Sequence, residues 1–241
     1  MCRLFAYKTK KPKETTQLLI QSLREFLLLA NNGCVPHGIE PGHNDGWGLI
    51  LYKGGDVCLH YKSLSSIKDD LNFNKILKII QDIEPEIVVS HLRKKTAGMD
   101  AYKNIQPLLY GGVSLSHNGT VFYGNDKKDK SISDSMYFLN QFIESKDVCL
   151  NLSEKIKTIQ ENIEKKYDYT AMNMIFSDGK NIFAVNNSNI NYKNFDKLCL
   201  DEYYKMYKMS AKDFVFICSE KIKSLAHHKI DVLKDKIVYK Y

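Results

Sequence analysis

The sequence lacks the features that would place the protein in a membrane or in the secretory pathway. No apolar run approaches the roughly 20 residues that a spanning helix needs, and the longest near the start, residues 26–30, lies inside a charged segment. The start does not resemble a signal peptide, because lysines interrupt its short apolar patch. Internal repeats, low-complexity segments and linkers are also missing from the 241 residues. We therefore expect one cytoplasmic globular domain over residues 1–241, with no membrane partner.

Cysteine is scarce and is not arranged as in disulfide-rich domains. The six cysteines are spread from residue 2 to residue 218, and no Cys-x-x-Cys pair occurs. A chain of this length without secretory features rarely depends on disulfides for its stability. We expect free thiols. Four of them are expected to be core residues, namely Cys58, Cys149, Cys199 and Cys218.

The excess of positive charge is modest. The formal net charge is +7, which could indicate a nucleic-acid partner. The lysines, however, alternate with Asp and Glu along the chain, and the two densest clusters, residues 8–13 and 127–130, contain no interleaved aromatic residues. A solvated surface explains this pattern better, so we expect no nucleic-acid partner.

Hydrophobic periodicity and turn residues predict groups of strands and helices. The expected helices cover residues 13–31, about 65–83 with Ser65 or Ser66 as the cap, 133–144 and 153–166. The expected strands cover residues 1–8, 46–52, 57–61, 87–91, 113–117, 172–177, 182–186, 214–218 and, as an edge strand, 234–241. Hairpins dominate this order, and few βαβ crossovers fit it. The pattern favours an α+β fold of layered antiparallel sheets flanked by helices.

What the sequence does contain is a cysteine directly after Met1. Removal of Met1 would leave Cys2 with a thiol, of reference pKa about 8.5, and a free α-amine, of reference pKa about 7.7–8.0. One residue could then supply a nucleophile and the base that activates it. The alternative is that Cys2 is an ordinary buried side chain. Its position alone does not decide between the two.

Further segments place reactive polar groups where strands are expected to end. Three glycines surround the only tryptophan in residues 42–48, which indicates tight turning. Arg93 follows an apolar strand in residues 90–98, where its guanidinium could bind a carboxylate. Taken singly, the first segment fits any structured turn, and Arg93 fits a surface salt bridge.

Two more segments have similar alternatives. Asn118 and Gly119, within residues 115–120, could donate hydrogen bonds to an oxyanion, or could form an ordinary Asn-Gly turn. Asp134, within residues 131–135, could bind an ammonium group, or could be a helix N-terminal residue favoured by the helix dipole.

In their order and spacing, these five features together resemble the class II glutamine amidotransferases. The shared pattern is Cys2, Gly-Trp-Gly, Ser-His-Leu-Arg, His-Asn-Gly and Ser-Asp-Ser, and it runs from the start to about residue 137. Residues 176–179 and 216–220 show a weaker likeness. Within the family the chain is most similar to stand-alone members that begin Met-Cys-Arg-Leu, which include the γ-glutamyl hydrolase of ergothioneine synthesis.

The resemblance implies a four-layer αββα sandwich of the N-terminal-nucleophile hydrolase type. It also implies that Cys2 attacks a glutamine side-chain amide, forms a γ-glutamyl thioester and releases ammonia, with its α-amine as general base. The Asn118 side-chain amide and the Gly119 backbone N–H would hold the tetrahedral oxyanion. Arg93, assisted by Thr96, would bind the α-carboxylate of glutamine, and Asp134 would accept its α-ammonium group. Water would then release glutamate, without a metal or an organic cofactor.

Several positions depart from the family pattern around the substrate pocket. Where relatives usually have Asn-x-His-Pro-Phe, this chain has Asn-Ile-Gln-Pro-Leu at residues 104–108, and Met136 replaces a common acidic residue. Lys94 and Lys95 stand where small or apolar residues are more usual. Free glutamine is therefore one candidate substrate, and a larger γ-glutamyl amide conjugate is the other.

Two further questions are which protein receives the ammonia and whether the site is catalytic at all. About 100 residues follow Tyr137 and are expected to complete the sandwich, so a separate synthase subunit would receive any ammonia that is used. The alternative to an enzyme is a catalytically silent protein that senses glutamine or acts as a scaffold. A silent protein would retain Met1, or would work without the Cys2 thiol.

Overall fold

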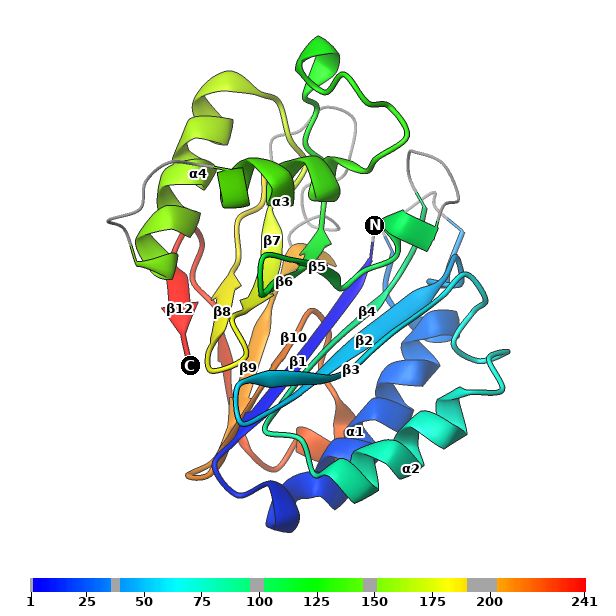
Figure 1. Cartoon of the computed structure of the whole chain (residues 1–241). Helices are drawn as coiled ribbons and strands as arrows, with labels where there is room; N and C mark the ends of the chain where they lie inside the picture. The colour runs from blue at the N-terminus through cyan, green and yellow to red at the C-terminus, as the bar shows by residue number, and fades with distance from the viewer. Residues whose placement is uncertain (1, 36–39, 96–101, 145–150, 190–202) are drawn as a thin grey trace.

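The computed structural model describes residues 2–35, 40–95, 102–144, 151–189 and 203–241. In these residues two antiparallel sheets face each other, and a pair of α-helices covers the outer side of each sheet (Figure 1). The order of layers is therefore αββα. This arrangement confirms the fold class that the family resemblance implies.

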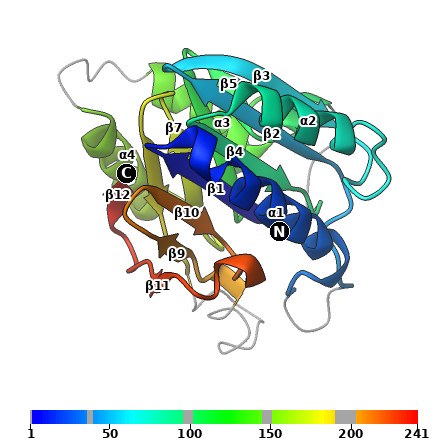
Figure 2. The ribbon, with the colours of Figure 1, turned by 90° about the horizontal axis from the view of Figure 1, so that it is seen from below.

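The larger sheet has seven strands, with the amino-terminal strand β1 in the middle. β1 pairs antiparallel with β10 on one side and with β4 on the other. Helices α1 (Pro12–Asn32) and α2 (Phe73–Ile83) pack side by side on the outer face of this sheet (Figure 2). In spatial order the strands are β11 (Lys229–Val232), β9 (Tyr207–Ser210), β10 (Phe214–Cys218), β1 (Arg3–Thr9), β4 (Ile87–Leu92), β2 (Trp47–Lys53) and β3 (Asp56–Ser63).

The smaller sheet has five strands, and its outer face is covered by α3 (Asp134–Glu144) and α4 (Leu152–Lys166). In spatial order the strands are β12 (Val238–Lys240), β8 (Ile182–Val185), β7 (Asn173–Ser177), β6 (Val113–Asn118) and β5 (Leu108–Tyr110). The described chain also has three short 3₁₀ turns, at Tyr102–Asn104, Gly124–Asp126 and Lys223–Leu225.

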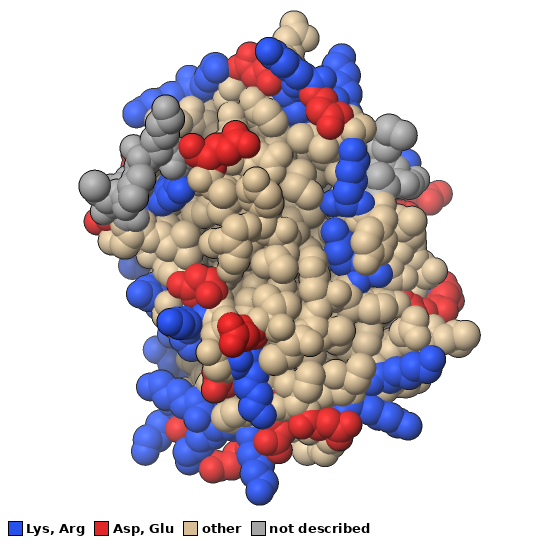
Figure 3. Space-filling view, in the orientation of Figure 1, with Lys and Arg blue, Asp and Glu red and all other residues tan. Residues whose placement is uncertain are grey.

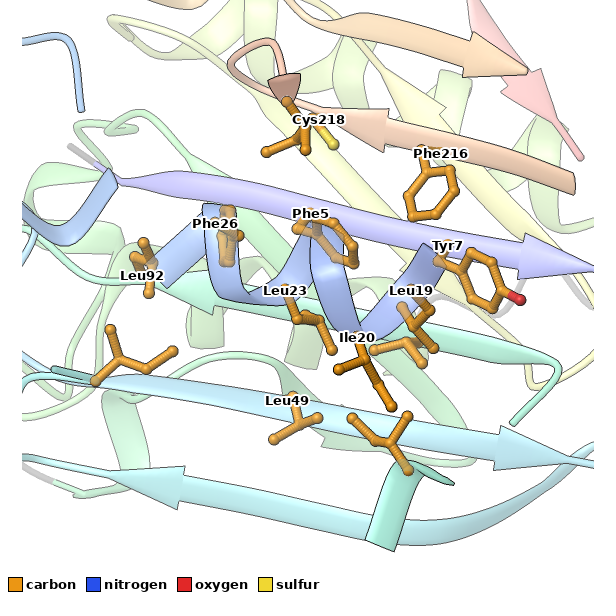
Figure 4. Close-up of a cluster of buried hydrophobic side chains, with 14 of the residues drawn as sticks. Phe5, Tyr7, Leu19, Ile20, Leu23, Phe26, Leu49, Leu92, Phe216 and Cys218 are labelled. Carbon is orange, nitrogen blue, oxygen red and sulfur yellow. The ribbon is translucent and has the colours of Figure 1, made fainter. Parts of the chain in front are cut away.

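Alternating side chains divide the interior into three apolar layers. In β1, Phe5 faces α1 and packs against the rings of Phe26 and Phe216 (Figure 4). Its neighbour Leu4 faces the second sheet instead. The third layer fills the space between the smaller sheet and its two helices. Because side chains alternate along a strand, Cys2 shares the face of Leu4 and points between the sheets.

The second helix is shorter than the sequence predicts. Apolar periodicity indicates a helix from about residue 65, but α2 begins only at Phe73. The Asp70 carboxylate accepts hydrogen bonds from the Trp47 indole at 3.0 Å and from the Tyr61 hydroxyl at 2.7 Å. These contacts tie the segment to β2 and β3, so Leu71 is 88% exposed and does not belong to an apolar face. The prediction of a helix over residues 65–72 is wrong.

The other expected helices and strands begin and end within two residues of the observed ones, apart from the last edge strand. That strand, β12, covers only Val238–Lys240, but it does lie at a sheet edge. Three strands were not expected from the sequence, namely β5, β9 and β11. Each has three or four residues, which is too short for a period of two to stand out.

One of the expected core cysteines is at the surface. Cys58 is exposed, because it lies near the start of β3, an edge strand whose first residues extend beyond the core. Cys218 is buried, as predicted. The cysteines that the structure describes are free thiols, which also agrees with the prediction. Cys149 and Cys199 lie outside the described residues.

Charged side chains of both signs share the molecular surface. On the face that Figure 3 shows, Lys and Arg lie around the rim with Asp and Glu among them, and the centre is mostly uncharged. In the parts of the chain that the structure covers, no helix has the length and apolar character needed to cross a bilayer.

Candidate active site

Cys2 lies at the start of β1, where the middle strand of the larger sheet approaches the end of β6 in the smaller one. Its backbone nitrogen donates a hydrogen bond of 2.7 Å to the side-chain Oδ1 of Asn118. Its sulfur lies 3.8 Å from the carbonyl oxygen of Lys94. Only 9% of the Cys2 surface is exposed. The two sheets therefore hold the thiol from both sides.

The orientation of the Asn118 amide follows from its partners. Its Oδ1 accepts the Cys2 N–H and also the Tyr203 hydroxyl, at 3.4 Å. Both partners donate, so the oxygen of the amide has to face them. The amide nitrogen Nδ2 is left buried with no hydrogen-bond partner among the described residues. A buried N–H donor without an acceptor is rare, and here it lies beside a thiol.

Gly119 follows Asn118 in a backbone conformation that other residues rarely adopt. Its φ is +146°, and a Cβ atom at this position would lie 1.9 Å from the carbonyl oxygen of Ala171. The close approach leaves no space for any side chain. Gly119 thus lets the chain turn out of β6 with its backbone against the cavity beside Cys2.

That cavity brings together residues that are far apart in the sequence. Its volume is about 40 Å³, and Cys2, Arg93, Gly119 and Asp134 all line it. Four of the six predicted site residues therefore share one cavity, and Asn118 lies next to it through its contact with Cys2. Thr96 lies outside the described residues.

Arg93 is held at the rim of the cavity by the glycine-rich turn before β2. Its backbone N–H donates to Gly46 at 2.9 Å, and the Asp45 N–H donates to the Arg93 carbonyl at 3.0 Å. Its guanidinium also donates to the Asp45 carbonyl at 3.3 Å. Gly46 has a φ of +114°, which explains the glycine in this turn. Only 7% of Arg93 is exposed, so the cation is buried beside the cavity.

Asp134 is the first residue of α3, on the opposite wall. Its Oδ2 accepts the backbone N–H of Val121 at 2.9 Å and lies 4.0 Å from Nδ1 of His117. Its side chain is 21% exposed, which leaves part of the carboxylate open to a ligand. A cation and an anion thus border the same cavity.

The family model for class II glutamine amidotransferases matches residues 1–200. The chain belongs to this family. A curated relative, an uncharacterized protein of Methanocaldococcus jannaschii, is 27% identical over 161 residues, which cover 59% of this chain and 42% of that protein. The family is one of enzymes, and its fold agrees with the two-sheet sandwich described above.

Two solved structures share this amidotransferase fold. The glutamine phosphoribosylpyrophosphate amidotransferase of B. subtilis, solved with ADP and GMP, aligns with a TM-score of 0.63 at 16% identity, over 100% of this chain and 49% of that one. A glutamine aminotransferase class-II domain protein of Silicibacter pomeroyi aligns with a TM-score of 0.59 at 13% identity, over 100% of this chain and 98% of that one. The chain spans less than half the length of the curated relative and of the B. subtilis enzyme.

In the wall of the cavity a buried network of Gln106, His117 and Ser135 supports the turn after β6. The Gln106 side chain accepts the His117 backbone N–H at 2.6 Å and donates to the Ser135 hydroxyl at 3.1 Å. The His117 ring contacts Ser135 through Nδ1 at 2.9 Å and the Ala171 carbonyl through Nε2 at 3.1 Å. Because a carbonyl only accepts, Nε2 carries the proton and Nδ1 accepts the hydroxyl. This network fixes the residue before Asn118.

The Cys2 thiol ionises far more easily than an ordinary thiol. In the chain with Met1 in place, burial raises its pKa, but the positive amino terminus, the His91 ring and the Lys94 backbone lower it more, to about 5. The thiolate, which is the nucleophilic form, therefore predominates at neutral pH.

Sequence reasoning did not identify Tyr203 as part of the site, and it included Ser135 only as a member of the Ser-Asp-Ser motif, without a role of its own. The Tyr203 hydroxyl donates to the Cys2 carbonyl at 3.3 Å as well as to Asn118, and the Arg3 guanidinium lies 4.4 Å from the centre of its ring. Tyr203 is 201 residues from Cys2 in the chain, and no local pattern marks it. The sequence marks Gln106 only as a residue that differs from the family pattern.

Proposed function

We propose that this protein hydrolyses the side-chain amide of glutamine through a γ-glutamyl thioester on Cys2, and so releases ammonia and glutamate. The observation that carries the proposal is the unpaired Nδ2 of Asn118, a buried donor beside the Cys2 thiol. A tetrahedral intermediate on the sulfur would offer an oxyanion to this donor. The N–H of Gly119 is proposed as the second donor.

The charges around the cavity support a zwitterionic substrate. We propose that Arg93, with Thr96, binds the α-carboxylate and that Asp134 accepts the α-ammonium group. A guanidinium binds a carboxylate with two parallel hydrogen bonds, which fixes its orientation. Both ends of glutamine would then be held while its side-chain amide reaches the sulfur.

In the proposed sequence of steps, the Cys2 thiolate attacks the amide carbon, and the carbon–nitrogen bond breaks as the nitrogen leaves with a proton. The α-amine of Cys2, exposed by removal of Met1, moves protons during this exchange. Water then attacks the thioester and releases glutamate. We propose that any ammonia used in synthesis passes to a separate synthase subunit.

The test is the intact mass of the purified protein before and after incubation with a diazoketone analogue of glutamine. We expect loss of Met1 and one adduct, mapped to Cys2. The Cys2→Ser variant should gain none under the same conditions. A processed chain that gains no adduct contradicts the use of free glutamine. A chain that retains Met1 supports the catalytically silent alternative.

The role of Asn118 has a separate readout. Replacing Asn118 with Ala removes one proposed oxyanion donor, so kcat for ammonia release should fall by a factor on the order of 10²–10³. KM should change much less, because the proposed contacts to the carboxylate and ammonium groups remain. A large rise in KM with unchanged kcat would count against an oxyanion role.

A second candidate is the hydrolysis of a larger γ-glutamyl amide. It is favoured by Lys94 and Lys95, which line the same cavity and could face an acidic group on the amide nitrogen. The two candidates are separated by kcat/KM, measured for free glutamine and for γ-glutamyl conjugates that carry an acidic or a neutral substituent. A clear preference for acidic conjugates would favour the second one.

A further inference from the structure

His91 is a buried titratable residue that the proposed mechanism does not use. It lies in β4 with 0% of its surface exposed. In the described parts of the chain neither ring nitrogen bonds a nitrogen or oxygen atom, and the ring interacts with the Cys2 thiol. Burying a polar ring without such bonds is costly, so the position of His91 calls for an explanation.

The position of His91 in the sheet points its ring at the nucleophile. Two residues earlier in β4, Val89 faces the second sheet, and side chains alternate along a strand, so His91 shares that face. Its partner across the ladder in β1 is Leu4, and Cys2 lies on the same face of β1, one step further on. The imidazole and the thiol therefore meet in the space between the sheets.

The other elements around His91 bring few titratable groups. β2 places Gly48 opposite it, which has no side chain. β6 contacts β4 and turns Ser116 and Asn118 toward the same layer, and neither ionises in the accessible pH range. Past the end of β4, Arg93 and Lys94 line the substrate cavity. The Cys2 thiol and the amino terminus are thus the groups that can exchange charge with the ring.

The second histidine near Cys2 is in a different situation. His117 uses both ring nitrogens, one with Ser135 and one with the Ala171 carbonyl. A second proton on the His117 ring would sit on Nδ1 and point at the Ser135 hydroxyl. That hydroxyl would then have to accept a hydrogen bond from Nδ1 and could no longer donate one to it. His117 therefore fits a structural role, whereas His91 has two ring nitrogens available for chemistry.

We propose that His91 accepts the proton of the Cys2 thiol, so that the resting site holds a buried thiolate–imidazolium pair between the two sheets. This inference rests on the proposed function of Cys2 as nucleophile. The S–H bond breaks, its electron pair stays on sulfur, and the proton forms an N–H bond on the imidazole. The net charge of the pair remains zero.

The surroundings of Cys2 agree with this assignment. Burial opposes ionisation of the thiol, and the His91 ring is one of the groups that lower its pKa to about 5, beside the amino terminus and the Lys94 backbone. Pairing the Cys2 thiolate with a neighbouring imidazolium avoids the burial of an isolated anion. With the thiol already ionised, the α-amine is left to transfer protons to the leaving nitrogen.

The test follows alkylation of Cys2 by iodoacetamide across pH, with the modified peptide quantified by mass spectrometry. Only the thiolate reacts, so the rate should fall as pH falls through about 5 in the native protein. In the His91→Gln variant the midpoint should move up by at least one pH unit, and the rate at low pH should fall about tenfold. His60→Gln is the matched control, because His60 bonds the Pro107 carbonyl away from Cys2, and it should leave the midpoint unchanged. An unchanged midpoint in folded His91→Gln overturns the proposal.

A second measurement avoids the risk that His91→Gln fails to fold. NMR of ¹⁵N-labelled histidine reports the protonation of His91 in the native protein and in Cys2→Ser. Coupled groups affect each other equally, so loss of the thiolate should move protonation of the ring to lower pH by at least one unit. Identical His91 titrations in the two proteins would overturn the proposal.

Neither measurement uses glutamine, so the two proposals can fail separately. Coupling of His91 and Cys2 without a glutamine-analogue adduct would reject the proposed substrate and keep the ion pair. An adduct on Cys2 without coupling would reject the ion pair and leave the α-amine as the base that activates the thiol.

Discussion

Cys2 and Cys218 are both buried in the larger sheet, but their thiols ionise in opposite ways. Burial alone acts on Cys218 and raises the pKa of its thiol strongly. At Cys2 the amino terminus and His91 oppose burial, and the pKa falls to about 5. The same side chain is therefore a neutral thiol at one position and mostly a thiolate, the reactive form, at the other.

Gln106 shows how a departure from the family pattern can preserve a role. Its side chain accepts from the His117 backbone and donates to Ser135 at the same time. A neutral imidazole also has one donor and one acceptor nitrogen, so Gln can meet the hydrogen-bonding need of a position where relatives usually have His. The sequence alone does not predict this role, because the two partners, His117 and Ser135, come from other parts of the chain.

The contribution of Gln106 to stability can be measured. Gln106→Ala leaves the buried His117 backbone N–H without a partner and removes one of the two hydrogen bonds of the Ser135 hydroxyl. The free energy of unfolding should therefore fall by about 1–3 kcal/mol. Gln17→Ala is the control, because Gln17 makes only an exposed bond to Gln81 and should change stability by less than about 0.5 kcal/mol. Urea denaturation measures both. Equal losses in the two variants would contradict a supporting role for the network.

At the scale of the element, two helices begin with asparagine in different ways. Asn151 forms a capping box at the start of α4, where its side chain accepts the Glu154 N–H at 3.1 Å and Glu154 bonds back to the Asn151 N–H. Asn72 precedes α2 and makes no capping bond with its side chain. We expect Asn151→Ala to lower the free energy of unfolding by about 1 kcal/mol.

Asn72→Ala is the matched control for this prediction. It should cost clearly less than Asn151→Ala, because its contacts with Tyr61 and Lys75 are exposed and no cap is lost. Chemical denaturation of the two variants and of the native protein measures the loss in the free energy of unfolding for each. A larger loss in Asn72→Ala would show that capping does not set the stability of these helix ends.

Most elements could be predicted because local signals and tertiary contacts agree. In α4 the apolar spacing, the Asn151 cap and the basic last turn all indicate one helix. Residues 65–72 also have apolar spacing typical of a helix. Asp70, however, accepts hydrogen bonds from the side chains of Trp47 and Tyr61, and these contacts hold the segment in a non-helical conformation. No local pattern reveals such a competitor, since those partners belong to strands on another part of the chain.

At the scale of the whole molecule, the site forms where the ends of several elements meet. Cys2, Arg93 and Asp134 could be named in advance, because each belongs to a short motif with a family pattern. Tyr203 could not be, because its contacts with Cys2 and Asn118 depend on how the last third of the chain closes over β1. Motifs therefore identified residues that line the cavity, while the fold revealed the residues that hold them in place.

The central place of β1 also orders events during synthesis. β1 is synthesised before its neighbour β10, which is more than 200 residues later, and Glu220, which pairs with Arg3 at 2.9 Å, follows β10. At about 5–20 residues per second, roughly 10 to 40 seconds pass between the two strands. The removal of Met1 that the proposed mechanism requires would have that interval in which to occur. Once β10 adds to the sheet, Cys2 is nearly enclosed.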